Sequence, residues 1–247
     1  MKKHLIIFTL LLINLTCFAQ IKDSSINIWQ FEINYSFQFP AGDMGSRFGY
    51  NSTIGAGLTY KLKSNWIFGI EASYLFGNIV KDSTILDNLK TESGNILNRD
   101  GEYGYIKFSE SGFYAGIKVG HLFAFNKPNK NSGILVNLGG GFLQHKILIE
   151  NKDNNIPSIT GNYKKGYDRL SNGLALREFV GYQYLSSNKY LNFYAGFEFY
   201  QAWTQCRRSI NFDTMQQDVS KRHDFLFGIR VGWILPIYKR TPDEFYY

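Results

Sequence analysis

The sequence has little cysteine, and this already limits its architecture. It contains 2 cysteines in 247 residues, and Cys17 lies in the apolar stretch that begins the chain. Cys206 is the one cysteine beyond that stretch. A single cysteine excludes an internal disulfide framework. No metal-ligand spacing surrounds Cys206, so we expect it to be a free thiol in a loop.

Long apolar runs are also missing after the first 20 residues. No later segment has a long uncharged apolar run. A membrane-spanning helix needs about 20 consecutive apolar residues. If the rest of the chain enters a membrane, it must do so as a closed β-barrel, because lipid cannot satisfy unpaired backbone groups.

The motifs of several enzyme classes are absent as well. The sequence contains no His-Glu-x-x-His, no paired Cys-x-x-Cys and no Gly-x-Ser-x-Gly. The glycines between Pro40 and Gly49 have neither the Walker nor the dinucleotide-binding spacing. We therefore predict no catalytic residues, no metal site and no cofactor. The 27 Lys and Arg are scattered among 20 Asp and Glu, so a nucleic-acid partner is not expected either.

The first residues have the pattern of a secretory signal peptide. Lys2 and Lys3 precede an apolar region, and the small residue Ala19 stands before Gln20. We predict a signal peptide over residues 1–19. An uncleaved anchor is the alternative, but the apolar region is too short to span a membrane. Lipidation of Cys17 is disfavoured, because Thr16 stands where a lipobox has Gly, Ala or Ser.

Strict alternation of apolar and polar residues is the main feature of the remaining chain. Over residues 29–39 every odd position is aromatic or Ile, and every even position is polar. Successive side chains of a strand point to opposite faces, so this segment has an apolar wall and a polar wall. A lipid-facing exterior and a polar lumen explain both walls. The pattern recurs over 53–62, 66–76, 113–123, from 134 onward, 174–185, 191–200 and 225–235.

These segments predict an all-β fold, an eight-stranded antiparallel up-and-down transmembrane β-barrel. The barrel occupies residues 20–238 and is followed by a periplasmic C-terminal tail over 239–247. Long loops should lie outside the cell and short turns in the periplasm, which places the protein in the outer membrane.

Aromatic residues on the apolar walls are expected to form girdles at the two membrane interfaces. The predicted girdle residues are Trp29, Tyr35, Trp66, Tyr74 and Trp233. One strand is irregular, because the alternation that turns Val180 and Tyr182 outward also turns Glu178 outward. A β-bulge at this point, or a strand end above the membrane, would remove the conflict.

The inward positions carry a nearly balanced set of charges. An eight-stranded barrel is just wide enough for side chains to fill, and buried opposite charges should pair. A plugged, ion-paired lumen is the favoured interpretation. A carboxylate-based active site with Glu32 and Glu71 and an open channel are the alternatives, although open channels need roughly 16 strands. The predicted lumen network is Glu32, Lys61, Glu71, Lys118, Glu198 and Arg230, with Arg177 as a further candidate.

Basic residues also gather in the predicted extracellular loops. They could contact the phosphates of lipopolysaccharide, or they could be ordinary solvated loop charges. Outer-membrane lipid and lipopolysaccharide are the predicted partners. The candidate contacts are Lys164, Lys165, Arg169, Arg207, Arg208, Lys221 and Arg222.

Four features together resemble small outer-membrane barrels of the Bacteroidota, of the PorT-like and OmpA/OmpX-like kind. They are the leader ending Phe18-Ala19-Gln20, the aromatics of the first strand, the segment 40–43 and the C-terminal segment 233–247. The resemblance implies a structural or accessory protein rather than an enzyme, in some cases within a complex for protein secretion or barrel assembly. The tail departs from the pattern of a chain that ends on its last strand, which would leave a periplasmic segment free to contact a partner. A lipid-modifying or hydrolytic barrel enzyme and a narrow pore or ligand-binding barrel are the alternatives.

Overall fold

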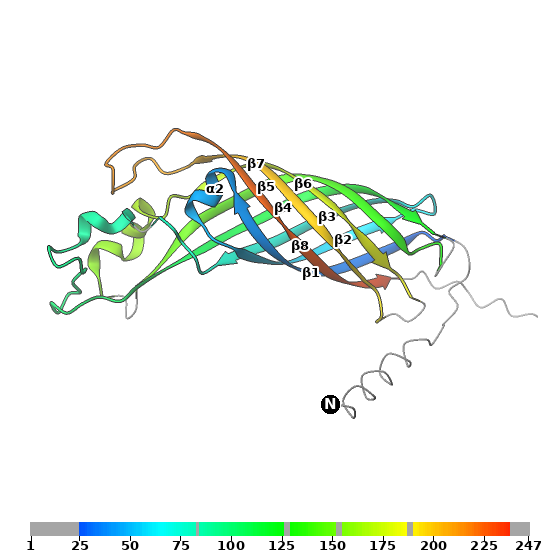
Figure 1. Ribbon diagram of the computed structural model, residues 1–247, viewed down its shortest axis with the longest axis horizontal. Coiled ribbons are helices and arrows are strands. Elements are labelled where there is room, and N and C mark those ends of the chain that lie inside the picture. The colour runs from blue at the N-terminus through cyan, green and yellow to red at the C-terminus, as the bar shows by residue number, and fades with distance from the viewer. Residues whose placement is uncertain (1–24, 83, 126–128, 152–154, 187–189, 238–247) are drawn as a thin grey trace, which may run out of the picture.

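The computed structural model describes residues 25–82, 84–125, 129–151, 155–186 and 190–237 of the chain, and these form one closed barrel of eight antiparallel strands (Figure 1). The predicted signal peptide and the C-terminal tail lie outside the described residues. The strands follow the ring in chain order, and the last strand pairs with the first. The predicted eight-stranded antiparallel barrel is therefore confirmed.

The strands alternate with long loops at one end and short turns at the other (Figure 1). We call these the loop end and the turn end. The strands are β1 (Ile28–Ala41), β2 (Asn51–Lys61), β3 (Trp66–Gly77), β4 (Ile106–Ala124), β5 (Gly133–Asn151), β6 (Ser171–Tyr184), β7 (Phe193–Cys206) and β8 (Lys221–Ile237).

Several strands are longer at the loop end than the alternation predicts. The segments predicted over 191–200 and 225–235 end too early on this side, because β7 continues to Cys206 and β8 begins at Lys221. In this region outward residues such as Gln205 are polar, so the apolar signal stops although the backbone pairing continues. Cys206 is consequently the last residue of β7 and is buried, not a loop thiol as expected.

The loops fold into a small cap of their own beyond the barrel. It contains α2 (Gly42–Arg47) and the 3₁₀ helices η2 (Thr84–Leu89), η4 (Pro157–Ile159) and η5 (Gly161–Gly166). Met44 and Phe48, on either side of the end of α2, are at most 1% exposed and close the loop end of the lumen. The loop residues Ile85, Leu86 and Ile159 are buried in the same apolar cluster.

Gly42 allows α2 to turn back onto the barrel. Its φ is +63°, and a Cβ atom at this position would lie 2.3 Å from the carbonyl oxygen of His223. Asp43 then accepts a hydrogen bond from the backbone N–H of His223 at 2.7 Å. A residue other than glycine would meet both a left-handed backbone and a steric clash.

Candidate functional site: the lumen, its mouth and the outer wall

An ion-pair network crosses the lumen at mid-height. Glu32 on β1 accepts a hydrogen bond from Lys118 on β4 at 2.6 Å, and Lys118 Nζ also lies 3.8 Å from Glu71 on β3. Arg230 on β8 joins Glu71 at 3.2 Å to Glu198 on β7 at 3.0 Å. Their side chains are at most 6% exposed, so these charges depend on one another rather than on water.

Arg177 on β6 belongs to the same network. Its Nε atom lies 2.5 Å from Glu71 Oε1, although the geometry is not that of a hydrogen bond. Its guanidinium also donates to Asn137 on β5, and Thr59 on β2 donates to Glu32. The network therefore has contacts with all eight strands, and its three carboxylates balance three basic groups.

Lys61 lies apart from this network. It stands at the turn end of β2, where its ammonium donates to Ser25 and Asn131 at 3.0 Å each. The alternation correctly indicates that Lys61 faces inward. It carries no information on depth, and an inward residue at a strand end does not reach groups at mid-height.

Apolar layers cover the network on both sides. Tyr114, Leu143, Tyr200 and Leu226 belong to the buried cluster on the loop side. The cluster on the turn side consists of Ile67, Leu122, Leu135, Phe179, Leu185, Tyr194 and Ile234. Charged groups that lie between two buried apolar clusters stabilise and specify a barrel.

The mouth of the barrel holds a second polar cluster beneath the loops. His145 Nε2 lies 2.9 Å from Asp224 Oδ2, and Thr204 donates to the same carboxylate. Arg47 of α2 donates to Ser171 at 3.4 Å, and burial together with the nearby charges of Arg222 and Arg169 lowers its pKa from the ordinary value. The hydrogen bond from Arg47 connects α2 to β6, and the contacts of Asp224 join β5, β7 and β8 beneath it.

The predicted lipopolysaccharide contacts divide into two groups. Arg169, Arg208 and Arg222 are paired with carboxylates of the chain, namely Asp82 and Asp213, Asp168, and Asp218 respectively. The hydrogen bonds from Arg208 to Asp168 raise the pKa of that arginine. Arg207 is exposed and donates to Asn172 at 2.6 Å. Lys165 and Lys221 are exposed, and Lys164 is partly exposed.

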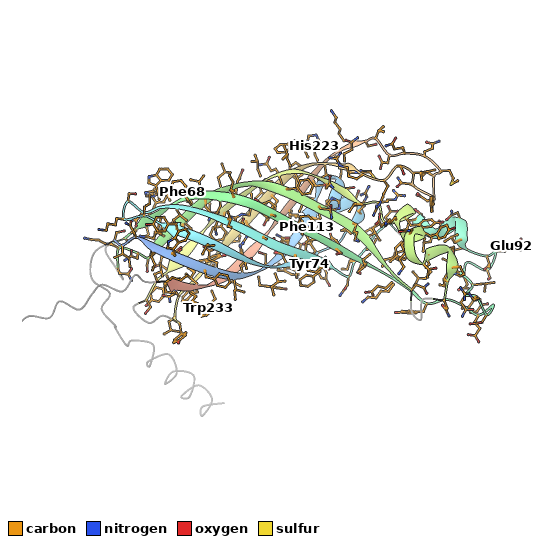
Figure 2. The ribbon with its side chains drawn as sticks, turned by 180° about the vertical axis from the view of Figure 1, so that it is seen from behind. Phe68, Tyr74, Glu92, Phe113, His223 and Trp233 are labelled. Atoms are coloured by element: carbon orange, nitrogen blue, oxygen red, sulfur yellow. The ribbon has the colours of Figure 1, made fainter. Side chains whose placement is uncertain are left out.

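Except at Glu178 on β6, the outer wall is apolar over the middle of every strand. We define the belt as the outward residues within 29–39, 54–60, 66–76, 113–123, 134–142, 174–184, 193–203 and 225–237. The five predicted girdle residues lie in it and are 38–49% exposed. Figure 2 shows Trp233 and Phe68 near the turn end, Tyr74 and Phe113 further along the barrel, and Glu92 at the tip of the loops. An apolar ring of this kind is the surface that a transmembrane β-barrel presents to lipid.

We also searched the described residues for metal sites and for membrane-spanning helices. No group of three or more His, Cys, Asp or Glu side chains there could hold a metal ion. No helix in this part of the chain is long and apolar enough to span a membrane.

No protein-family model and no curated protein matches the chain. Among solved structures it is similar to Neisserial surface protein A, with 10% identity, a TM-score of 0.45, and coverage of 84% of this chain and 96% of the other. It is also similar to Ail of Yersinia pestis, with 10% identity, a TM-score of 0.43, and coverage of 85% and 99%. The outer membrane protein OprG of Pseudomonas aeruginosa has 12% identity, a TM-score of 0.40, and coverage of 87% and 99%. These three are small eight-stranded outer-membrane barrels.

Proposed function

We propose that this outer-membrane β-barrel is a non-catalytic protein that serves as an accessory or structural subunit of a larger outer-membrane complex, of the kind used in protein secretion or barrel assembly. The observation that carries the proposal is the closed lumen. Its charges are paired with one another and lie between two apolar layers. A barrel of this construction offers its outer wall and its loops, rather than its interior, to other molecules.

The interior supports the two alternative functions, a barrel enzyme and a narrow pore, less well than it supports an accessory role. The carboxylates Glu32 and Glu71 are held by Lys118, Arg177 and Arg230, so neither is free to act on a substrate. A pore would need a polar path past Phe179 and Tyr194, which belong to the apolar cluster on the turn side.

Lipopolysaccharide at the loop end is a second, compatible role. Arg207, Lys165 and Lys221 are exposed, and phosphate groups are natural partners of such side chains. The paired arginines Arg169, Arg208 and Arg222 would serve the folding of the loops in this proposal. We also propose that the protein is one of the PorT-like barrels of the Bacteroidota that its sequence resembles.

Gentle solubilisation of outer membranes tests the accessory role. An affinity tag inserted after Met215, which is 69% exposed in the loop between β7 and β8, leaves the barrel wall untouched. We expect a second membrane protein to be recovered in fixed ratio to the barrel and to be identified by mass spectrometry. Recovery of the barrel alone would refute the accessory role, and lipid A turnover and conductance would then be the next measurements.

A further inference from the structure

A carboxylate lies on the lipid-facing wall. Glu178 on β6 is exposed and shares the outer face with Leu176 and Val180. It faces Leu138 on β5 and Phe199 on β7, and the pairing on both sides of β6 runs through this position without a bulge. The bulge that would have turned this side chain inward is therefore not present.

The depth of Glu178 also excludes the other explanation, which is a strand end above the membrane. The belt on β6 extends from Leu174 to Tyr184, so Glu178 lies four residues from one edge and six from the other. At about 3.3 Å per residue and a tilt near 45°, these edges are roughly 9 Å and 14 Å away along the membrane normal. A glutamate side chain does not reach either interface from there.

Gln201 on β7 is the one polar neighbour that the structure gives to Glu178 on this wall, and it donates to Glu178 Oε1 at 3.4 Å. The belt contains no Lys or Arg among the residues that the structure describes. An ionisable group that faces lipid at this depth is expensive, and such groups mark functional positions. A carboxylate can accept several hydrogen bonds, and one long hydrogen bond from a neutral amide leaves most of these acceptor positions unfilled.

An apolar groove adjoins Glu178. It has a volume of about 470 Å³ and lies over β6, β7 and β8, with Phe39 of β1 at its edge. Phe39 stacks on Phe227 with ring centroids 5.8 Å apart. The outward residues that line the groove are Phe39, Val180, Phe197, Phe199, Phe227 and Ile229. A rigid aromatic surface around one desolvated polar group has the composition of a protein–protein hot spot.

We propose that the outer face of β6–β8, centred on Glu178, docks onto a second membrane-spanning protein that presents a Lys or Arg side chain to this carboxylate. The inference rests on the proposed accessory function and names the face and the chemistry of the contact. Charge complementarity selects the occupant. A lipid carries its polar groups at the interfaces, and a second copy of this chain offers no Lys or Arg from the belt.

Two variants and a matched control test the docking face. Glu178→Leu removes the carboxylate, and Glu178→Gln keeps a polar group but no charge. Gln144→Leu is the control, because Gln144 also faces outward, on β5, but does not line the groove. A photo-cross-linker at Phe197 reports on the groove, and one at Ile54 on β2, which does not line the groove, reports on another part of the outer wall.

We expect Glu178→Leu to reduce recovery of the partner at least tenfold, Glu178→Gln to reduce it less, and Gln144→Leu to leave it unchanged. The isolated Glu178→Leu barrel should unfold at a urea concentration no lower than that of the wild type. Phe197, and not Ile54, should cross-link to the recovered protein.

Each other outcome overturns the inference in a recognisable way. A partner that is recovered equally with Glu178→Leu and cross-links from Ile54 leaves the accessory function intact and refutes this face. Cross-links from Phe197 only to lipid or to a second copy of the chain refute the stated occupant. An isolated Glu178→Leu barrel that is less stable than the wild type shows a structural role instead. If the wild type recovers no partner, the accessory function itself fails.

Discussion

Lys118 Nζ lies 2.6 Å from Glu32 Oε2, and this contact joins β4 to β1 across the lumen. The two strands are not neighbours in the ring, so the pair acts as a strut between separate parts of the wall. Both side chains are at most 6% exposed. Removing one partner of such a pair leaves a buried charge without compensation.

Lys118→Met should therefore lower the free energy of unfolding by about 3–5 kcal/mol. Adding Glu32→Gln should restore part of this loss, because the carboxylate that lacks a partner is then removed as well. Urea unfolding in detergent or lipid measures both. Lys165→Met, at an exposed loop position, is the control and should change stability by no more than about 0.5 kcal/mol. Equal effects of Lys118→Met and the control would show that the pair contributes nothing.

Gly42→Ala should destabilise the docking of α2 by about 1–3 kcal/mol, because it combines a left-handed backbone with a clash against the carbonyl of His223. Gly161→Ala separates the two causes. Gly161 has a φ of +54°, but a Cβ atom there would meet nothing within 4 Å. Limited proteolysis at the loop end, followed by mass spectrometry, should show faster cleavage near residue 42 in the first variant. Comparable effects at both glycines would mean that the backbone conformation alone decides.

The purified barrel should produce no stepwise current in a planar lipid bilayer. The inward side chains on both sides of the ion-pair network are buried, so they leave ions no water-filled path. Arg230→Ala should destabilise the barrel without opening it, because the layer that contains Phe179 and Tyr194 remains in place. Steady channels in the wild type would contradict the closed lumen and favour the pore alternative.

Cys206 should resist thiol reagents in the folded protein. It is 5% exposed at the end of β7. A maleimide should label it only after unfolding in urea, with a rate at least tenfold lower in the folded barrel. Thr214→Cys, at an exposed position of the next loop, provides the accessible reference thiol. Equal labelling of both positions would show that the end of β7 opens readily.

The alternation of side chains made the strands, their faces and the closed ring predictable. The two-residue period of a strand assigns each residue to a wall, and Glu71, Lys118 and Arg230 all face inward as this period requires. It does not assign depth, so it groups Lys61 with charges that Lys61 does not reach.

The loop cap could not be predicted in the same way. Ile85, Leu86 and Ile159 lie in segments without a regular period, and they are buried only because distant loops meet above the barrel. The carboxylates that pair with Arg169 come from two different loops, at Asp82 and Asp213. Contacts of this kind depend on tertiary arrangement rather than on local pattern. Glu178, in contrast, was visible as a conflict in the sequence, and the conflict is real.

The pairing of β1 with β8 has a consequence for how the protein folds. Trp29 pairs with Ile237, so the ring closes only when residues from opposite ends of the described chain meet. Contacts between such distant residues form slowly. A slip of one residue at this seam would turn Glu32 outward into lipid and Trp29 inward. The alternating walls thus disfavour a wrong register between β1 and β8, because a ring closed in that register would be poorly stable in the membrane.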